Sequence, residues 1–184
     1  MRILPFDHPR RVPWKNGRGS TLELATDAAT VGGAWTWRLS LADVPEAGPF
    51  SEYPGIDRSI VLLEGAGLVL ESPGSRCEVP RAGRGLAFPG DNPTVGIPCG
   101  PGVRDANVMV VRGRWRGDVH LLLAGTHELR GDTVVVHAYD GALSIDGVAM
   151  RRVSINRGET LITDRPMTLR VQTLGRAIGA VFTG

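Results

Sequence analysis

The chain has 184 residues, 42% of them hydrophobic, and a formal net charge of +2. This length fits one compact domain or two closely joined lobes with a sizeable core, and so small a charge does not suggest a nucleic-acid-binding surface. The sequence contains no run of eighteen apolar residues, so it predicts no membrane-spanning helix. The first residues lack the pattern of a secretory signal. Two cysteines, Cys77 and Cys99, are too few for a disulfide framework. We therefore expect a cytoplasmic protein.

Short runs rich in Val, Ile, Leu and Thr alternate with turn residues along the chain, which contains 25 Gly and 13 Pro. This pattern is typical of a sandwich or barrel of short strands. Residues 35–41 alternate bulky apolar and polar side chains, as a half-buried strand does. No sustained helical periodicity is present, and at most a short helix is expected near residues 9–14 or 42–46. The sequence thus predicts an all-β protein.

Pairs of neighbouring apolar runs predict antiparallel strand pairs. The pairs are residues 59–63 with 67–71, residues 142–145 with 148–150 across the turn signal Asp146-Gly147, and residues 168–173 with 177–182. Most aromatic and polar motifs lie in residues 1–113, whereas residues 114–184 are a plainer succession of strands and turns. We expect two β-lobes, with a ligand pocket in the first and a mainly structural second.

Signatures of common catalytic sites are absent. The sequence has no GxSxG, HExxH or P-loop motif, and no GxGxxG that opens a helix. The four histidines are not paired along the sequence, and we interpret each as a structural residue: His8, His120, His127 and His137.

The stretch from Gly48 to Gly65 has the outline of the first cupin motif. That motif has two histidines and a glutamate, which bind a metal ion, at fixed distances before its last glycine. Counting back from Gly65 places Arg58 at the glutamate position and Tyr53 and Ser51 at the histidine positions. Guanidinium, phenol and hydroxyl groups are poor ligands for a divalent ion, but an arginine fork binds a carboxylate well.

The second cupin motif is also incomplete. Gly83 and Pro89-Gly90-Asp91 resemble its opening, but no histidine follows. We therefore expect no metal and no other cofactor. The favoured role for Arg58 is to bind an anionic ligand in the barrel; the alternative is an ion pair with Asp57 or Asp91 that supports the barrel.

Lys15 is the single lysine among 21 Lys and Arg residues. Lys15 and Asn16 precede Gly17, so an ammonium and an amide could lie over the barrel mouth where glycine lets the backbone approach a ligand. The alternative is a plain turn in which Trp14 covers the edge of the core.

Several separated stretches together resemble the HutD/Ves family of bicupin proteins. They are Pro13–Glu23, Trp37–Ser40, Gly48–Gly65, Phe88–Asp91 and Asp105–Met109, which are spread over most of residues 1–113. The resemblance implies a bicupin fold without a catalytic metal. It also implies a link to histidine utilisation, where such proteins are thought to sense or buffer intermediates such as formylglutamate or urocanate; other members are described only as stress-induced.

The candidate ligand-binding residues combine the motif positions with polar residues of the matching stretches. Arg38 shares a strand face with Thr36 and Ser40, so it lines either the pocket or the surface. Asp91, Asp105 and Asn107 also have the character of turn and network residues. The full set is Arg58, Lys15, Asn16, Ser51, Tyr53, Arg38, Asp91, Asp105 and Asn107.

Three functions are compatible with the sequence. The first is a regulatory or buffering protein that binds a small carboxylate. The second is a cupin-type enzyme that uses Lys15 or Tyr53 as acid or base on a small acidic substrate. The third is a partner-binding protein with a vestigial pocket. A homodimer through a sheet edge or face is a further expectation.

Overall fold

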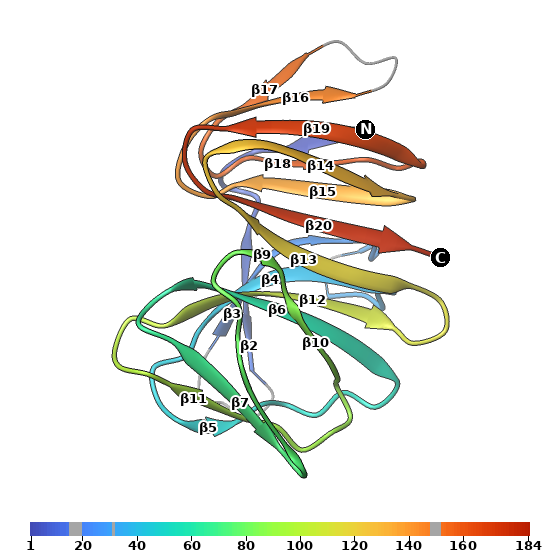
Figure 1. Ribbon diagram of the computed structural model, residues 1–184. Helices are drawn as coiled ribbons and strands as arrows, with labels where there is room; N and C mark the ends of the chain where they lie inside the picture. The colour runs from blue at the N-terminus through green and yellow to red at the C-terminus, as the bar shows by residue number, and fades with distance from the viewer. Residues whose placement is uncertain (15–19, 31, 148–151) are drawn as a thin grey trace.

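The computed structural model describes residues 1–14, 20–30, 32–147 and 152–184, and every regular element in them is a strand. These residues contain no helix long and apolar enough to cross a membrane. The strands form four antiparallel sheets that are stacked as two barrels, one above the other in Figure 1. The all-β bicupin prediction is confirmed.

Each barrel consists of an outer sheet and an inner sheet. The N-terminal outer sheet contains β5 (Gly48–Pro49), β11 (Val95–Pro98), β7 (Leu68–Ser72) and β8 (Ser75–Glu78). The N-terminal inner sheet contains β10 (Leu86–Pro89), β6 (Ile56–Glu64), β12 (Arg104–Val111), β4 (Trp37–Asp43), β3 (Ser20–Thr26) and β2 (Arg10–Pro13).

The second barrel repeats this arrangement. The C-terminal inner sheet contains β1 (Arg2–Leu4), β18 (Thr160–Ile162), β15 (Thr133–Ala138), β20 (Ala177–Thr183), β13 (Arg116–Leu122) and β9 (Gly83–Arg84). The C-terminal outer sheet contains β14 (Gly125–Gly131), β19 (Met167–Thr173), β16 (Leu143–Gly147) and β17 (Val153–Ile155).

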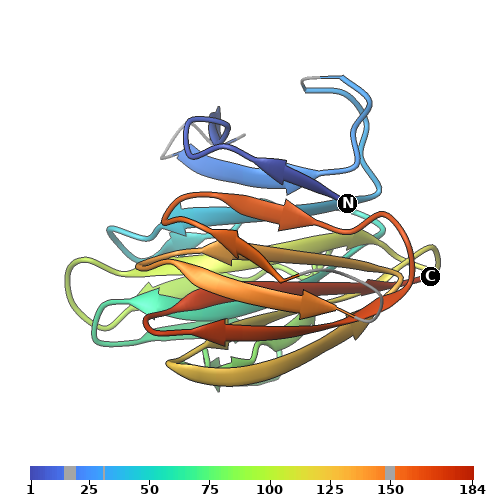
Figure 2. The same cartoon turned by 90° about the horizontal axis from the view of Figure 1, so that it is seen from above.

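The division into lobes at residue 113 stays a prediction, because strands from before this residue form hydrogen bonds with strands from after it. Strand β1 pairs with β18, and β9 pairs with β13, so two segments of the first 113 residues complete the C-terminal inner sheet. Figure 2 shows the N-terminal segment along one side of the stack. The two barrels are therefore joined by exchanged strands as well as by side-chain packing.

The predicted strand pairs are corrected by the structure. Residues 59–63 lie in β6 and residues 68–71 lie in β7, but β6 pairs with β10 and β12 while β7 pairs with β8 and β11. The turn at Gly65 carries the chain from the inner to the outer sheet. This glycine has a φ of 94°, and a Cβ there would lie 2.8 Å from the Cα of Val103, so the last glycine of the motif is required sterically.

The two C-terminal pairs are also corrected. Strands β19 and β20 lie in different sheets, because β19 pairs with β14 and β16 while β20 pairs with β13 and β15. Asp146 and Gly147 belong to strand β16, and Ile145 pairs with Val153. The connection is thus longer than a two-residue turn, and residues 148–150 lie outside the described residues.

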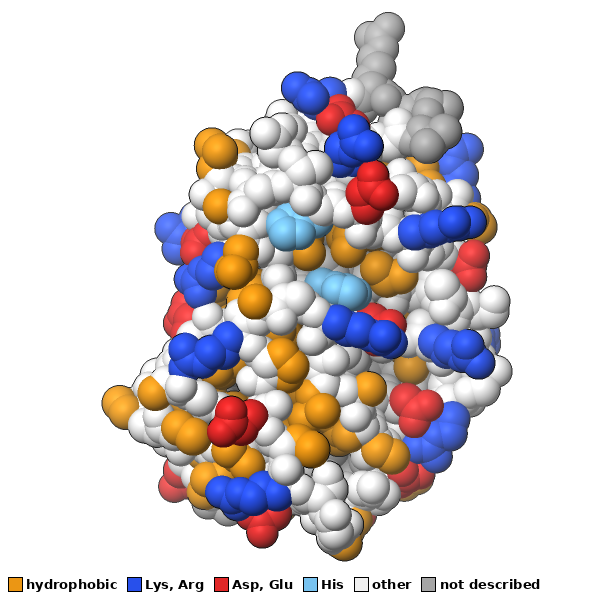
Figure 3. All heavy atoms as spheres, in the orientation of Figure 1, with side chains coloured by type: hydrophobic (Ala, Val, Ile, Leu, Met, Phe, Trp, Pro, Cys, Tyr) orange, Lys and Arg blue, Asp and Glu red, His pale blue; other side chains and the backbone are white. Residues whose placement is uncertain are grey.

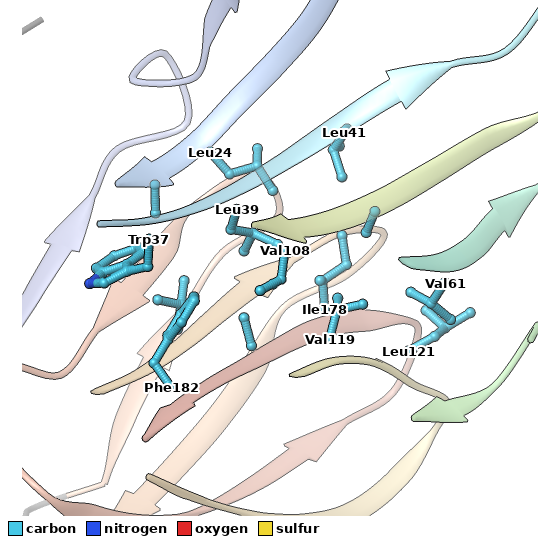
Figure 4. Close-up of a cluster of buried hydrophobic side chains, with 14 of the residues drawn as sticks. Leu24, Trp37, Leu39, Leu41, Val61, Val108, Val119, Leu121, Ile178 and Phe182 are labelled. Atoms are coloured by element: carbon cyan, nitrogen blue, oxygen red, sulfur yellow. The ribbon is translucent and has the colours of Figure 1, made fainter. Parts of the chain in front are cut away.

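The main core lies between the two inner sheets. Strand β4 contributes Trp37, Leu39 and Leu41, and strand β12 contributes Ala106, Val108 and Val110. They pack against Val119, Ile178 and Phe182 of the C-terminal inner sheet, as Figure 4 shows. Smaller clusters fill each barrel between its inner and outer sheets. The odd-numbered residues of β4 and the even-numbered residues of β12 point into the main core. The even-numbered residues of β4 and the odd-numbered residues of β12 therefore face into the N-terminal barrel.

His137 of β15 is buried on the face of the C-terminal inner sheet that carries Val135 and packs against the N-terminal barrel; its Nδ1 lies 2.9 Å from the hydroxyl of Thr160. Burial lowers its pKa to about 4, so between pH 6.5 and pH 4 the unfolded chain binds more protons than the folded one. In this window the free energy of unfolding should fall with falling pH by ~3 kcal/mol more in the wild type than in His137→Gln. Urea denaturation of both proteins at pH 7, 5.5 and 4 measures this difference, and parallel stability curves would contradict it.

Candidate ligand-binding site

The N-terminal barrel contains a cavity of about 60 Å³ between its two sheets. Its wall includes three neighbouring strands of the inner sheet, whose register places the side chains in rows. Met109 of β12 lies opposite Arg38 of β4 on one side and Arg58 of β6 on the other. The next rows pair Asn107 with Ser40 and Asp105 with Ala42. The alternation of strand residues thus brings two arginines, an amide and a carboxyl group to one cavity.

Arg58 is the most strongly constrained of these groups. It is 8% exposed, and its guanidinium carbon lies 5.0 Å from the ring centre of Phe50 and 4.9 Å from that of Phe88. Its Nε has no hydrogen-bond partner in the described part of the chain. Burial lowers the pKa of Arg58 to about 10, against the opposing effect of Asp105. The side chain therefore remains cationic at neutral pH.

Glycines fix the surroundings of Arg58. A Cβ at Gly90 would lie 2.8 Å from the carbonyl oxygen of Ile56 and 3.3 Å from Cδ of Arg58. A Cβ at Gly96 would lie 2.4 Å from the ring of Phe50. These positions need glycine because the backbone of the loop and of β11 approaches the arginine and its aromatic neighbour directly.

Arg38 forms the second cationic group of the wall. One of its terminal nitrogens lies 3.1 Å from Sδ of Met109, and its guanidinium carbon lies 5.1 Å from the ring centre of Trp35 and 5.9 Å from that of Tyr53. Its Nε is buried without a hydrogen-bond partner among the described residues. A sulfur atom is a weak acceptor, so much of the donor capacity of Arg38 remains for a ligand.

Buried acceptors lie beside these donors. Asp105 is 1% exposed and Asn107 is 6% exposed, and Oδ1 of each has no partner within the described ranges. Burial raises the pKa of Asp105 to about 7; the charge of Arg58 opposes the rise and that of Asp43 adds to it. Unpaired buried polar groups cost free energy unless a ligand or water satisfies them, so a polar molecule in the cavity would reduce this cost.

Most of the predicted site residues lie together. Six of them line the cavity: Arg58, Ser51, Tyr53, Arg38, Asp105 and Asn107. Lys15 and Asn16 lie outside the described residues. The preceding Trp14 does line the cavity, and its indole nitrogen donates to the hydroxyl of Thr21 at 2.7 Å.

Asp91 is not among the residues that line this cavity. It lies in the turn after β10 and accepts two hydrogen bonds from Arg112, at 2.8 and 3.0 Å. Arg112 also donates to Asp57 at 2.8 Å. Both carboxylates that were the alternative partners of Arg58 are thus paired with Arg112, and Arg58 forms no ion pair within the described residues.

Some cavity residues were not among the sequence candidates. Phe50, Ser40 and Met109 line the wall, and Phe88 lies against Arg58. Residues 38, 40 and 42 lie on one face of their strand, and residues 105, 107 and 109 lie on one face of the neighbouring strand. This alternation could have identified Ser40 and Met109 if the pairing of the two strands had been known.

The donor set of the cavity does not fit a divalent metal ion. Ser51, Tyr53 and Arg58 occupy the positions of the ligands in the first cupin motif, and all three line the cavity. Asp105 is the one carboxylate among the lining residues that are described, and none of these is a histidine or cysteine. Across the described ranges no group of three or more His, Cys, Asp or Glu side chains is placed to hold a metal. A fixed guanidinium charge would repel a cation there.

A second hollow lies on the outside of the C-terminal barrel. His120 and His127 both line this groove, with Leu123 beside them, and histidines among apolar side chains can be seen on the face in Figure 3. Nε2 of His127 lies 2.7 Å from the carbonyl oxygen of Leu123. The groove carries no buried unpaired polar group in the described residues, in contrast to the N-terminal cavity.

Comparisons with solved structures agree with this architecture. A conserved protein of unknown function from Pseudomonas aeruginosa PAO1 is 29% identical and superimposes with a TM-score of 0.84, covering 100% of this chain and 98% of that one. HutD from Pseudomonas fluorescens SBW25 is 27% identical, with a TM-score of 0.75 over 99% of this chain and 97% of that one. Oxalate decarboxylase of Bacillus subtilis, which has Mn(II) centres, shares the fold at 8% identity and a TM-score of 0.62.

Comparisons of sequence identify the family. An uncharacterised 21.2 kDa protein from the hutC 3' region of Pseudomonas putida is 36% identical over 110 residues, which are 60% of this chain and 57% of that protein. Protein Ves of Citrobacter koseri is 28% identical over 84% of this chain and 90% of its own length. The model of the HutD family matches residues 7–179, and the chain therefore belongs to the HutD family.

Proposed function

We propose that the protein binds a small carboxylate in the cavity of its N-terminal barrel. The observation that carries this proposal is Arg58, a buried cation on the cavity wall with no ion-pair partner and an unpaired Nε in the described residues. Burying a charge without a partner is costly, and a planar guanidinium donates two parallel hydrogen bonds to a carboxylate. A bound carboxylate would supply the missing charge.

The second arginine indicates the shape of the ligand. Arg38 and Arg58 lie on either side of Met109, so their backbones are two strand spacings apart, roughly 9–10 Å. An elongated molecule with a carboxylate and another polar group suits this arrangement. Formylglutamate has two carboxylates and urocanate has a carboxylate and an imidazole, and both are intermediates of histidine degradation.

The names of the relatives support a role in that pathway. One relative of known structure is a HutD, and a relative found by sequence comparison is described as a protein in the hutC 3' region. We propose that ligand binding has a regulatory or buffering role, in which the level of an acidic intermediate determines the occupied fraction of the protein.

A thermal-shift comparison of acids with their amides tests the binding. N-formyl-L-glutamate, urocanate and formate are compared with formamide and the corresponding neutral amides. An acid that binds should raise Tm, because a ligand at 100 times its Kd stabilises the folded state by about 2.7 kcal/mol, whereas the uncharged amide should not. Equal shifts from acid and amide, or no shift from any of the three acids, would contradict the proposal.

Catalysis is the second candidate function, and the Asp105 carboxyl favours it. With a pKa of about 7, it is suited to transfer protons at neutral pH, and the Tyr53 hydroxyl belongs to the same cavity. Incubation of urocanate or N-formyl-L-glutamate with the protein, followed by proton NMR, would show new products if the site is catalytic. An unchanged spectrum in the presence of bound ligand would contradict catalysis and support binding only.

A further inference from the structure

A buried carboxyl group lies inside the cavity proposed to bind an anion. Asp105 is 1% exposed, and its Oδ1 has no hydrogen-bond partner in the described chain. It lies on β12 two residues before Asn107 and four before Met109, on the strand face that lines the cavity. An ionised Asp105 would repel a carboxylate ligand, whereas a protonated one could donate a hydrogen bond to it.

We propose that the cavity takes up its carboxylate ligand together with one proton, which Asp105 holds in the complex. This inference rests on the proposed function. The proton comes from solvent and forms the O–H bond of the Asp105 carboxyl; the group then changes from a repelling charge to a donor. Asp105 is thus a binding residue that couples the affinity to pH.

The charges around Asp105 favour this coupling. Burial and the charge of Asp43 of β4 oppose ionisation of Asp105, while Arg58 of β6 stabilises the ionised carboxylate. Arg38 and Tyr53 also line the cavity, and Lys15 lies outside the described residues. Together these effects hold the pKa of Asp105 near 7 in the free protein. A carboxylate bound at Arg58 offsets the cation that favours ionised Asp105, so binding raises this pKa further.

Isothermal titration calorimetry with N-formyl-L-glutamate tests the proton uptake. Both carboxyl groups of this probe are ionised above pH 6, so the probe itself does not titrate. At pH 7, titrations in buffers with different ionisation enthalpies should show uptake of about half a proton. Because only the protonated fraction of the protein binds, Kd should rise about tenfold between pH 6 and pH 8.

Asp105→Asn gives a neutral side chain of the same shape. This variant should show no proton uptake and no rise of Kd, and at pH 8 it should bind more tightly than the wild type, a gain that misfolding cannot produce. Asp118→Asn is the matched control, since Asp118 forms an ion pair with Arg84 outside the cavity; it should keep the pH dependence of the wild type.

The outcomes separate this inference from the function on which it rests. Binding with a constant Kd and no proton uptake would overturn the role of Asp105 and leave the binding function in place. So would an unchanged pH dependence in Asp105→Asn. Absence of binding in both the wild type and Asp105→Asn at every pH would overturn the binding of this acid, and the inference with it.

Discussion

Replacing Arg58 by alanine should raise the Kd of N-formyl-L-glutamate by at least about 30-fold. The variant loses a buried cation and its two-donor fork, and truncating one partner of a buried charge pair costs about 2–5 kcal/mol of binding free energy. Calorimetric titration at pH 6.5 measures the change. Arg58→Lys should lie between the wild type and Arg58→Ala, because an ammonium keeps the charge but not the planar fork.

Arg112→Ala is the matched control for this loss. Arg112 is also an arginine of the N-terminal barrel, but it is 43% exposed and pairs with Asp57 and Asp91 outside the cavity. We expect its Kd to stay close to that of the wild type. If Arg58→Ala is folded by circular dichroism and binds as tightly as Arg112→Ala, Arg58 is not the anion-binding group.

Replacing Phe182 by alanine should lower the free energy of unfolding by about 3–5 kcal/mol. Phe182 is completely buried between the two inner sheets, and its ring centre lies 4.5 Å from that of Trp37. Truncation leaves a cavity in the core that joins the barrels (Figure 4), so both barrels lose packing contacts. Urea denaturation followed by tryptophan fluorescence measures the loss.

Leu174→Ala is the control for Phe182→Ala. Leu174 is 88% exposed, and a surface truncation of this kind should change the free energy of unfolding by less than about 0.5 kcal/mol. A loss below about 1 kcal/mol in Phe182→Ala would show that the packing between the inner sheets contributes little to stability.

The strands could be predicted from the sequence, but their partners could not. Alternation in residues 35–41 correctly indicates a strand, although β4 begins only at Trp37 and ends at Asp43, and it places Arg38 on one face with Ser40. The same pattern is compatible with any neighbour, because a period of two residues describes a strand and not its pairing. The pattern therefore predicts a hairpin of residues 59–63 and 67–71, whereas in the structure the chain crosses between sheets at Gly65.

The site could be predicted in part, through the spacing of the cupin motif. Counting back from Gly65 identified Arg58, Tyr53 and Ser51, and all three line one cavity. The motif could not reveal Phe50 as a contact of Arg58, because that contact depends on the three-dimensional approach of β11 at Gly96. The motif also does not indicate which of its charged residues form ion pairs outside the cavity.

Asp91 illustrates this last point. Its place in the second motif made it a ligand candidate, but its ion pair with Arg112 depends on a residue 21 positions away in the sequence. That pairing lowers the pKa of Asp91 to about 2, and it also removes Asp91 as a partner of Arg58. Arg58 has no ion-pair partner among the described residues, and this feature, on which the proposed function depends, is a property of the tertiary structure.

A crystal structure of the protein with N-formyl-L-glutamate tests most directly whether a permanent cation has taken the place of the metal in this cupin barrel. We expect a ligand carboxylate in the N-terminal cavity, with its oxygens about 2.7–2.9 Å from the guanidinium nitrogens of Arg58. A divalent ion coordinated at that position, or a ligand bound elsewhere with Arg58 turned into solvent, would contradict the account.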